Sequence, residues 1–225
     1  MSSKDVGLID IQLDPHVDNY AVMGNPVAHS KSPEIHKAFA EQTGQKLKYQ
    51  SIFVPQGEFN SAIKLFSNLG GKGLNITLPY KQDAYDIVTN ASERAKIATA
   101  ANTLTFKPDA TIDGDNTDGV GLVRDLDSNG IKIKDKRLLI IGAGGAVRGI
   151  LGPLLDKTPS SIVIANRTLS RAENLISNFA SDLNITARGL SDLENIDSFD
   201  LIINATSSDL IGEFPQLPGT LVSSN

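Results

Sequence analysis

Short apolar runs alternate with segments of helical periodicity along this chain, and the alternation predicts an α/β fold. Residues 20–24 form the first run, and residues 58–68 carry apolar side chains at the spacing of one helix face. Between them, Ser32 followed by Pro33 is typical of a helix N-cap and first helical residue. The segment from residue 102 to 113 predicts a β-hairpin. Repeated changes from strand to helix favour a largely parallel sheet.

The pattern changes after residue 118. Residues 137–141, 161–165 and 200–204 are nearly continuous aliphatic runs, as expected for strands of a sheet that is covered on both faces. We therefore predict two domains, with the boundary near Thr117, after a loose N-terminal extension over residues 1–19.

Composition excludes several classes of function. A net charge of -5 and a pI near 5.2 make nucleic acid an unlikely partner, so a small-molecule substrate is expected. The absence of cysteine excludes disulfides and thiolate zinc sites, and the three histidines lack the spacing of a metal site. Residues 1–17 resemble neither a signal peptide nor a membrane span. We expect a cytoplasmic protein that binds no metal and no membrane.

A glycine-rich turn follows the buried strand over residues 138–141 and precedes a helix. This context is typical of a dinucleotide site, where the pyrophosphate binds the N–H groups at the helix start. The candidate cofactor-binding residues are Gly142, Ala143, Gly144, Gly145 and Ala146. Val147 departs from the usual pattern, because the third position of this motif normally holds a smaller residue.

The end of the next strand indicates which dinucleotide is bound. NAD enzymes place a carboxylate there for the ribose 2′-hydroxyl, and this chain has none. Arg167 and Arg171 instead provide guanidinium groups suited to a 2′-phosphate, and Asn166 and Thr168 add polar groups. The sequence therefore predicts NADP as the cofactor. The alternative is that both arginines pair with Glu173 or face solvent.

Two segments far apart in the chain carry candidate acid/base chemistry. Residues 73–81 end in Lys81, and residues 114–119 place Asp118 before a glycine. A Lys and an Asp beside a nicotinamide ring are able to supply the proton that a ketone oxygen needs when hydride reaches its carbon.

These motifs resemble, in the same order, those of the shikimate dehydrogenase family, and the likeness runs from Tyr20 to about Gly219. The similar stretches are residues 20–33, 73–81, 102–104, 116–119, the turn at Gly142, and residues 166–168 and 204–208. The resemblance implies an N-terminal α/β substrate domain over residues 20–117 and a Rossmann-like NADP-binding domain over residues 118–225. It implies NADPH-dependent reduction of 3-dehydroshikimate to shikimate, on the chorismate route to aromatic amino acids.

The resemblance also implies roles for individual residues. Ser30 and Ser32 would bind the substrate carboxylate, which agrees with the partial positive charge of a helix that starts at Pro33. Three residues would bind ring hydroxyls: Asn75, Thr77 and Asn102. Lys81 would be the proton donor, and Asp118 would orient the ammonium and a substrate hydroxyl. Thr206 joins the cofactor-binding residues, whereas His29 is expected to be structural and His36 to lie on the surface.

The chain also departs from the family. Thr99, Ala101 and Asp209 replace residues usual at those positions, and the family continues beyond Asn225 with another strand and further helices. A strand over residues 200–204 without that neighbour would leave an aliphatic edge open to association, so a homodimer is among the expected partners. Two alternatives to the predicted NADP-dependent shikimate dehydrogenase stay open. One is an NAD-dependent quinate/shikimate dehydrogenase, and the other is a truncated, non-catalytic remnant that binds NADP or shikimate.

Overall fold

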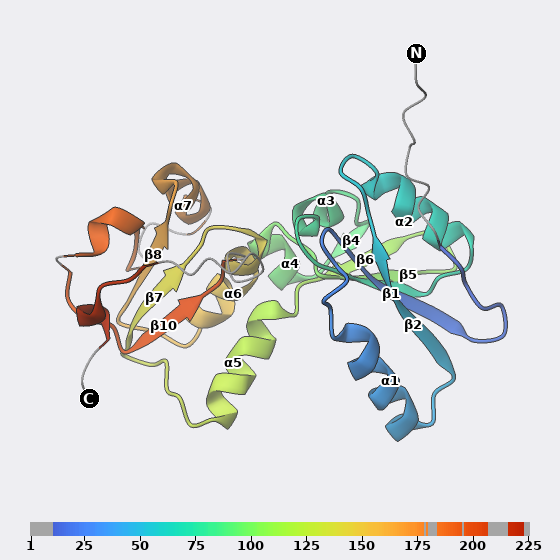
Figure 1. Ribbon diagram of the computed structural model, residues 1–225, viewed down its shortest axis with the longest axis horizontal. Helices are drawn as coiled ribbons and strands as arrows, with labels where there is room; N and C mark the ends of the chain where they lie inside the picture. Colours follow the sequence, from blue (N-terminus) through green and yellow to red (C-terminus); the bar gives the residue numbers. More distant parts are fainter. Residues whose placement is uncertain (1–10, 178, 180–183, 195, 207–215, 223–225) are drawn as a thin grey trace, which may run out of the picture. The chain divides into compact units, whose positions relative to one another are not determined.

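A computed structural model describes residues 11–177, 179, 184–194, 196–206 and 216–222 (Figure 1). The chain divides into two compact units, residues 1–116 and 117–225. Most of the expected N-terminal extension, residues 1–10, and position Asp209 lie outside the described residues. No described helix has both the length and the apolar character that a membrane crossing requires.

The first unit is a mixed six-stranded sheet with the strand order β2-β1-β3-β5-β6-β4. Its strands are β1 (Asp18–Gly24), β2 (Leu47–Phe53), β3 (Gly73–Ile76), β4 (Asn90–Ala91), β5 (Thr103–Phe106) and β6 (Ile112–Asp115). Strand β1 runs parallel to both β2 and β3, while β5 is antiparallel to β3 and β6. The β5–β6 pair confirms the predicted hairpin.

Four helices accompany this sheet: α1 (Ser32–Thr43), α2 (Phe59–Asn68), α3 (Lys81–Asp86) and α4 (Glu93–Ala98). Helix α2 buries Phe59, Ile63 and Phe66 in a core that includes Met23 of β1 and Leu74 of β3. Because side chains alternate along a strand, the residues between them face the other side of the sheet. Helix α1 lies on that other side, opposite α2 (Figure 1).

Two sequence expectations for this unit are wrong. Ile11 and Leu13 pack against the core, so this part of the expected extension is not loose. Helix α1 begins at Ser32, with Lys31 at the N-cap position, instead of taking Ser32 as its cap. The reason is local: the Ser30 hydroxyl accepts the Ser32 N–H at 3.3 Å, which satisfies a donor at the helix start.

The second unit is a four-stranded parallel sheet with the order β10-β7-β8-β9. Its elements are α5 (Asp118–Ser128), β7 (Arg137–Ile141), α6 (Gly145–Leu155), β8 (Ser161–Asn166), α7 (Leu169–Ile176), β9 (Ile185–Gly189), the 3-10 turn η1 (Leu190–Leu193), β10 (Leu201–Asn204) and the 3-10 turn η3 (Gly219–Leu221).

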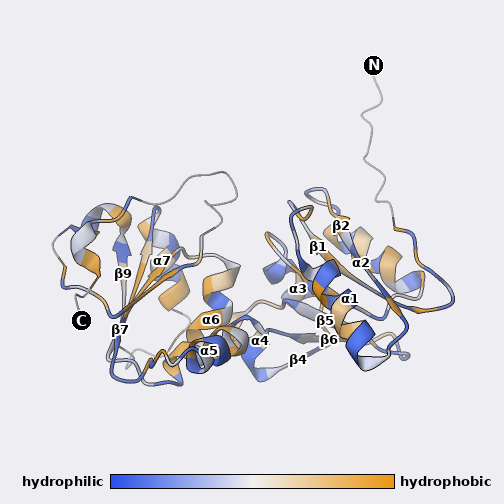
Figure 2. Cartoon of the chain, turned by 60° about the horizontal axis from the view of Figure 1, so that its bottom comes forward, coloured by the Kyte–Doolittle hydropathy of each residue, from blue (hydrophilic) through white to orange (hydrophobic). Residues whose placement is uncertain are grey.

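Both faces of this sheet are covered, which explains its aliphatic strands. Leu138 and Ile140 of β7 belong to one core cluster, and Leu139 and Ile141 belong to another. Figure 2 shows much of β7 and α6 as hydrophobic. These features confirm the predicted Rossmann-like α/β architecture.

The edge at β10 is partly occupied. Among the described residues, β10 pairs with β7 alone, but Phe199, just before it, forms a parallel bridge with Val222. Leu221 is fully buried in the same region. The expected bare edge is therefore covered at the end where β10 begins.

Candidate active site

Two serine hydroxyls meet at the N-terminus of α1. Ser30 Oγ lies 3.2 Å from Ser32 Oγ, and both residues are half-buried. They lie at the start of a 12-residue helix, whose N-terminus carries a partial positive charge. Hydroxyl and amide donors at such a helix start are suited to a carboxylate.

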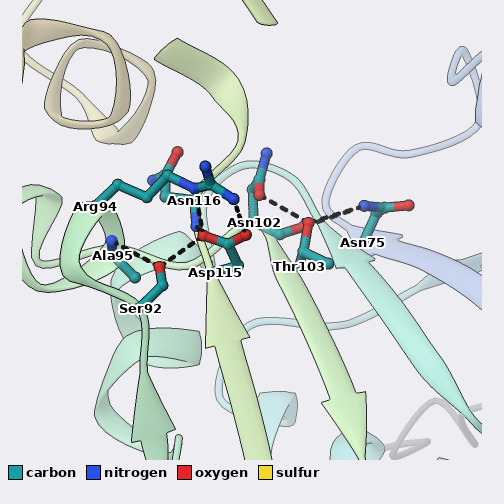
Figure 3. A network of polar contacts seen from close by, with 8 residues as sticks. All are labelled: Asn75, Ser92, Arg94, Ala95, Asn102, Thr103, Asp115 and Asn116. Carbon is teal, nitrogen blue, oxygen red and sulfur yellow. Dashed lines mark hydrogen bonds and ion pairs between the residues drawn. The ribbon is translucent and has the colours of Figure 1, made fainter. Parts of the chain in front are cut away.

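A second group of polar side chains lies at β3. The Tyr49 hydroxyl donates to Asn75 Oδ1 at 2.7 Å, which orients the Asn75 amide. Asn75 Nδ2 then points to the carbonyl of Asn102 and to Thr103 Oγ1, each at 3.4 Å. Figure 3 shows the contact between Asn75 and Thr103 and its continuation to Asn102. The structure thus brings the predicted residues Asn75 and Asn102 into one network.

Thr77 follows β3 and lies directly against the end of β1. Its N–H donates to the Met23 carbonyl at 2.9 Å. Gly24, at the end of β1, leaves room for the Thr77 side chain. A Cβ at position 24 would lie only 2.2 Å from Thr77 Cγ2. This close approach requires glycine at position 24. It holds Thr77 at the end of β3, the strand that carries Asn75.

His36 and Tyr49 belong to this region and were missed as functional candidates. The His36 imidazole stacks on the Tyr49 ring with centroids 4.1 Å apart, so this residue, expected on the surface, is only partly exposed. Burial lowers the His36 pKa, and a hydrogen bond with Asn75 acts in the opposite direction. Burial raises the pKa of Tyr49, and a hydrogen bond with Ser32 opposes that shift. The sequence does hold one signal, since His36 lies one helical turn after Ser32.

Lys81 and Asn102 are connected through the backbone. Lys81 is the first residue of α3, and its carbonyl accepts the Ala101 N–H at 2.7 Å. Asn102 is 9% exposed, and its N–H donates to the Asp115 carbonyl at 2.9 Å. Its Oδ1 accepts the Thr103 hydroxyl at 2.9 Å, which directs the oxygen end of the amide toward β5.

Asp118 is the first residue of α5, after Thr117 at the N-cap position. It therefore belongs to the second unit, whereas Lys81 belongs to the first. The pairing of Lys81 with Asp118 stays a prediction.

The glycine turn of the second unit connects β7 to α6. Gly142 adopts φ 113°, and a Cβ there would lie 3.0 Å from the Ala205 carbonyl oxygen. Gly144 is the N-cap of α6 and Gly145 its first residue, so Ala143 and Ala146 flank the helix start. The unusual Val147 is fully buried in the core, which explains how the larger residue is accommodated.

The residues after β8 are arranged around a backbone turn. Asn166 Nδ2 donates to the Thr168 carbonyl at 2.8 Å, and the Arg171 N–H donates to that carbonyl at 3.1 Å. Arg167 and Arg171 are both exposed, and no ion pair joins either of them to Glu173 in the described part of the chain. The proposed pairing with Glu173 is therefore wrong, and the second alternative, exposure to solvent, describes both side chains as they stand.

Thr206 lies beside the glycine turn. Its methyl group would be 3.4 Å from a Cβ at Gly142. Its hydroxyl donates to Asn204 Oδ1 at 2.8 Å, which holds the chain where it leaves β10. Among the described residues, no group of His, Asp or Glu is placed to hold a metal ion.

Two family models match the chain. One, described as the shikimate dehydrogenase substrate binding domain, matches residues 22–104, and the other, described as shikimate / quinate 5-dehydrogenase, matches residues 125–211. A protein named shikimate dehydrogenase (NADP(+)) from Hahella chejuensis is 50% identical over 210 residues, which cover 93% of this chain and 77% of that protein. One of the same name from Chromobacterium violaceum is 52% identical over 202 residues, covering 89% and 73%.

Solved structures show the same likeness. An Ael1 enzyme from Pseudomonas putida has a TM-score of 0.79 at 42% identity, over 91% of this chain and 74% of that one. Shikimate 5-dehydrogenase from Thermus thermophilus, solved in complex with NADP(H) and shikimate, has a TM-score of 0.76 at 30% identity, over 91% and 75%.

Proposed function

The chain belongs to the shikimate dehydrogenase family, and on that premise we propose that it catalyses the NADP-dependent, reversible reduction of 3-dehydroshikimate to shikimate. The observation that carries this proposal is the polar group in the first unit, where the Tyr49 phenol donates to Asn75 Oδ1 at 2.7 Å and the Ser30 and Ser32 hydroxyls lie 3.2 Å apart. Anion-binding hydroxyls and hydroxyl-binding amides are thereby gathered on one face of the sheet. A cyclic carboxylic acid that carries hydroxyl groups presents the matching chemistry.

Each side chain of this group has a role in the proposal. Ser30 and Ser32 bind the substrate carboxylate at the start of α1, where the helix dipole favours an anion. Amide and hydroxyl groups bind the ring hydroxyls, and the residues concerned are Asn75, Thr77 and Asn102. Since these groups are half-buried or buried, their hydrogen bonds to a substrate are shielded from water.

Lys81 and Asp118 carry out the proton transfer. Bound NADPH supplies a hydride to the ketone carbon of the substrate, and the oxygen then needs a proton. Lys81 donates that proton as an ammonium group, and Asp118 orients both the ammonium and a neighbouring substrate hydroxyl.

The second unit holds the cofactor. The backbone of residues 142–146 binds the pyrophosphate, because the start of α6 at Gly145 leaves its first N–H groups without helical partners and Gly142 turns the chain sharply toward that start. Arg167 and Arg171 bind the 2′-phosphate, with Asn166 and Thr168 beside them, and Thr206 lines the turn at Gly142. Exposed guanidinium groups without a carboxylate from Glu173 favour a phosphate ligand.

We further propose a cytoplasmic enzyme of aromatic amino acid biosynthesis whose partners are small molecules and not nucleic acid. The net charge of -5 supports this, because it disfavours a polyanionic partner. A homodimer is also proposed, through the side of β10 that pairs with no strand among the described residues.

Turnover of shikimate by the purified chain tests the function. We expect reduction of NADP⁺ in the presence of shikimate, with lower rates for NAD⁺ and for quinate. A chain that binds NADPH without oxidising shikimate would contradict catalysis, and a preference for NAD⁺ would favour the quinate/shikimate alternative.

A further inference from the structure

Asp115 is the centre of an unusually dense set of hydrogen bonds at the end of β6. Its carboxylate accepts Ser92 Oγ at 2.6 Å, Arg94 Nε at 2.6 Å, Arg94 Nη2, and the Asn116 N–H at 2.7 Å. These four donors come from α4, its N-cap and the residue after β6, and they meet at one side chain (Figure 3). A bidentate arginine with two further donors restrains a carboxylate strongly.

The same residue restrains the segment that follows α4. The Asp115 carbonyl accepts the Asn102 N–H at 2.9 Å. Asn116, which is 1% exposed, donates from Nδ2 to the Ala100 carbonyl at 3.0 Å. The segment over residues 100–102 is therefore attached at both of its ends to the corner formed by Asp115 and Asn116.

This segment carries the proposed substrate site. Asn102 is one of the hydroxyl-binding residues, and the Ala101 N–H holds the carbonyl of Lys81 at 2.7 Å. The Asn102 carbonyl accepts the Ile76 N–H at 2.8 Å, at the end of the strand that bears Asn75. A shift of the corner would move Asn102 and the first turn of α3 together.

We propose that the Asp115–Arg94 ion pair is a positioning element of the substrate site, which holds Asn102 and Lys81 in place through the segment over residues 100–102. The inference rests on the proposed function. Asp115 acts through other residues and transfers no proton itself.

Asp113 provides a matched control on the same strand. It pairs with Lys107 at 3.0 Å and accepts Asn90 Nδ2 at 3.0 Å, so it too is an ion-paired aspartate of β6. Within the described residues, these side-chain contacts do not involve the segment over residues 100–102. Asp113→Asn therefore removes the same charge from the same strand without touching the restraint.

The kinetic experiment compares Asp115→Asn, Arg94→Gln and Asp113→Asn in the complete chain. We expect kcat/KM for shikimate to fall by about 10- to 100-fold in the first two variants, the scale of a displaced catalytic group. The affinity of these two variants for NADP should be unchanged. In Asp113→Asn, both kcat/KM for shikimate and NADP affinity should equal those of the wild type. Because the pair acts as a unit, the double variant of Asp115 and Arg94 should lose little more than either single one.

A cycle with Asn102→Ala separates positioning from general structural support. If Asp115 acts through Asn102, Asp115→Asn should lower kcat/KM for shikimate by a smaller factor in the Asn102→Ala variant than in the wild type. Equal losses in both backgrounds, or equal weakening of shikimate and NADP binding, would overturn the inference.

Amide hydrogen exchange tests the restraint without any substrate. We expect faster exchange of the Ala101 and Asn102 amides in Asp115→Asn than in Asp113→Asn, with the core strand β1 unchanged. Unchanged exchange at Ala101 and Asn102 would overturn the inference, whatever the enzyme does. A wild-type chain that never oxidises shikimate would instead overturn the proposed function and, with it, the catalytic role of the restraint.

Discussion

The imidazole of His36 lies flat on the ring of Tyr49, with centroids 4.1 Å apart and planes within 5° of each other. The contact joins α1 to β2 and brings an ionisable ring beside the Tyr49–Asn75 hydrogen bond. Because the ring is partly buried, the neutral form is favoured and the His36 pKa lies below its ordinary value.

The pKa of His36 in the folded protein should therefore lie below the ordinary histidine value of 6.5, and an NMR titration of its ring signals measures it. A lowered pKa means that the unfolded chain binds the proton more readily, so stability falls as pH drops below about 6.5. His36→Gln should remove this part of the pH dependence. A His36 pKa at or above that of an unfolded peptide would contradict the effect of burial.

Asp115 should affect stability in a lower pH range. The Arg94 guanidinium holds the Asp115 pKa at about 2, below the 3.8 of an unperturbed group. The contribution of ionised Asp115 to the free energy of unfolding is complete above about pH 4. It is lost as the pH falls through the pKa of Asp115 in the folded protein. Denaturant unfolding at several pH values should show wild type and Asp115→Asn converging near the acid end. A constant difference at all pH values would mean that the ionised carboxylate contributes nothing specific.

Lys81→Ala should lower turnover by about 10²- to 10⁴-fold, the usual effect of removing a positioned acid or base. NADP binding should persist, because Lys81 lies in the first unit and the glycine turn in the second. Asp118→Asn should act similarly, and the double variant should be far from additive. Steady-state rates across pH are the measurement, and wild-type turnover in Lys81→Ala would exclude it as the proton donor.

Arg167→Ala should weaken NADP binding more than NAD binding, since a guanidinium binds the 2′-phosphate that only NADP carries. Calorimetric titration of both cofactors gives the two affinities. An equal loss for both would indicate that Arg167 contacts the adenine or supports the fold.

Gly24→Ala should destabilise the first unit by about 1–3 kcal/mol, the usual cost of overpacking. The new Cβ would lie 2.2 Å from Thr77 Cγ2 and 3.0 Å from the Leu78 carbonyl oxygen. We expect a higher KM for shikimate as well, because Thr77 must move. Gly121→Ala is the control, since nothing lies within 4 Å of its Cβ position in α5 and alanine favours a helix. Thermal unfolding that ranks the two variants alike would contradict the close packing at Gly24.

The sequence alone was enough for the architecture and the family. The aliphatic strands of the second unit indicate a sheet covered on both faces, and Leu138 to Ile141 do divide between two cores. The turn at Gly142 was also readable, because glycine spacing after a strand reflects a local backbone requirement. Such features depend on residues that are close in the chain, so short sequence motifs predict them.

Only the tertiary structure showed how those motifs are held together. Tyr49 and Asn75 lie 26 residues apart, and Arg94 and Asp115 lie 21 apart. No periodicity links such pairs, since their contacts arise when β1 lies between β2 and β3 and when α4 packs beside β6. His36 has an ordinary helical position in the sequence, and only the strand packed against α1 makes it a ring stacked on Tyr49. A side chain's surroundings depend on which elements the fold brings together, and that is decided by packing between distant segments and not by local preference.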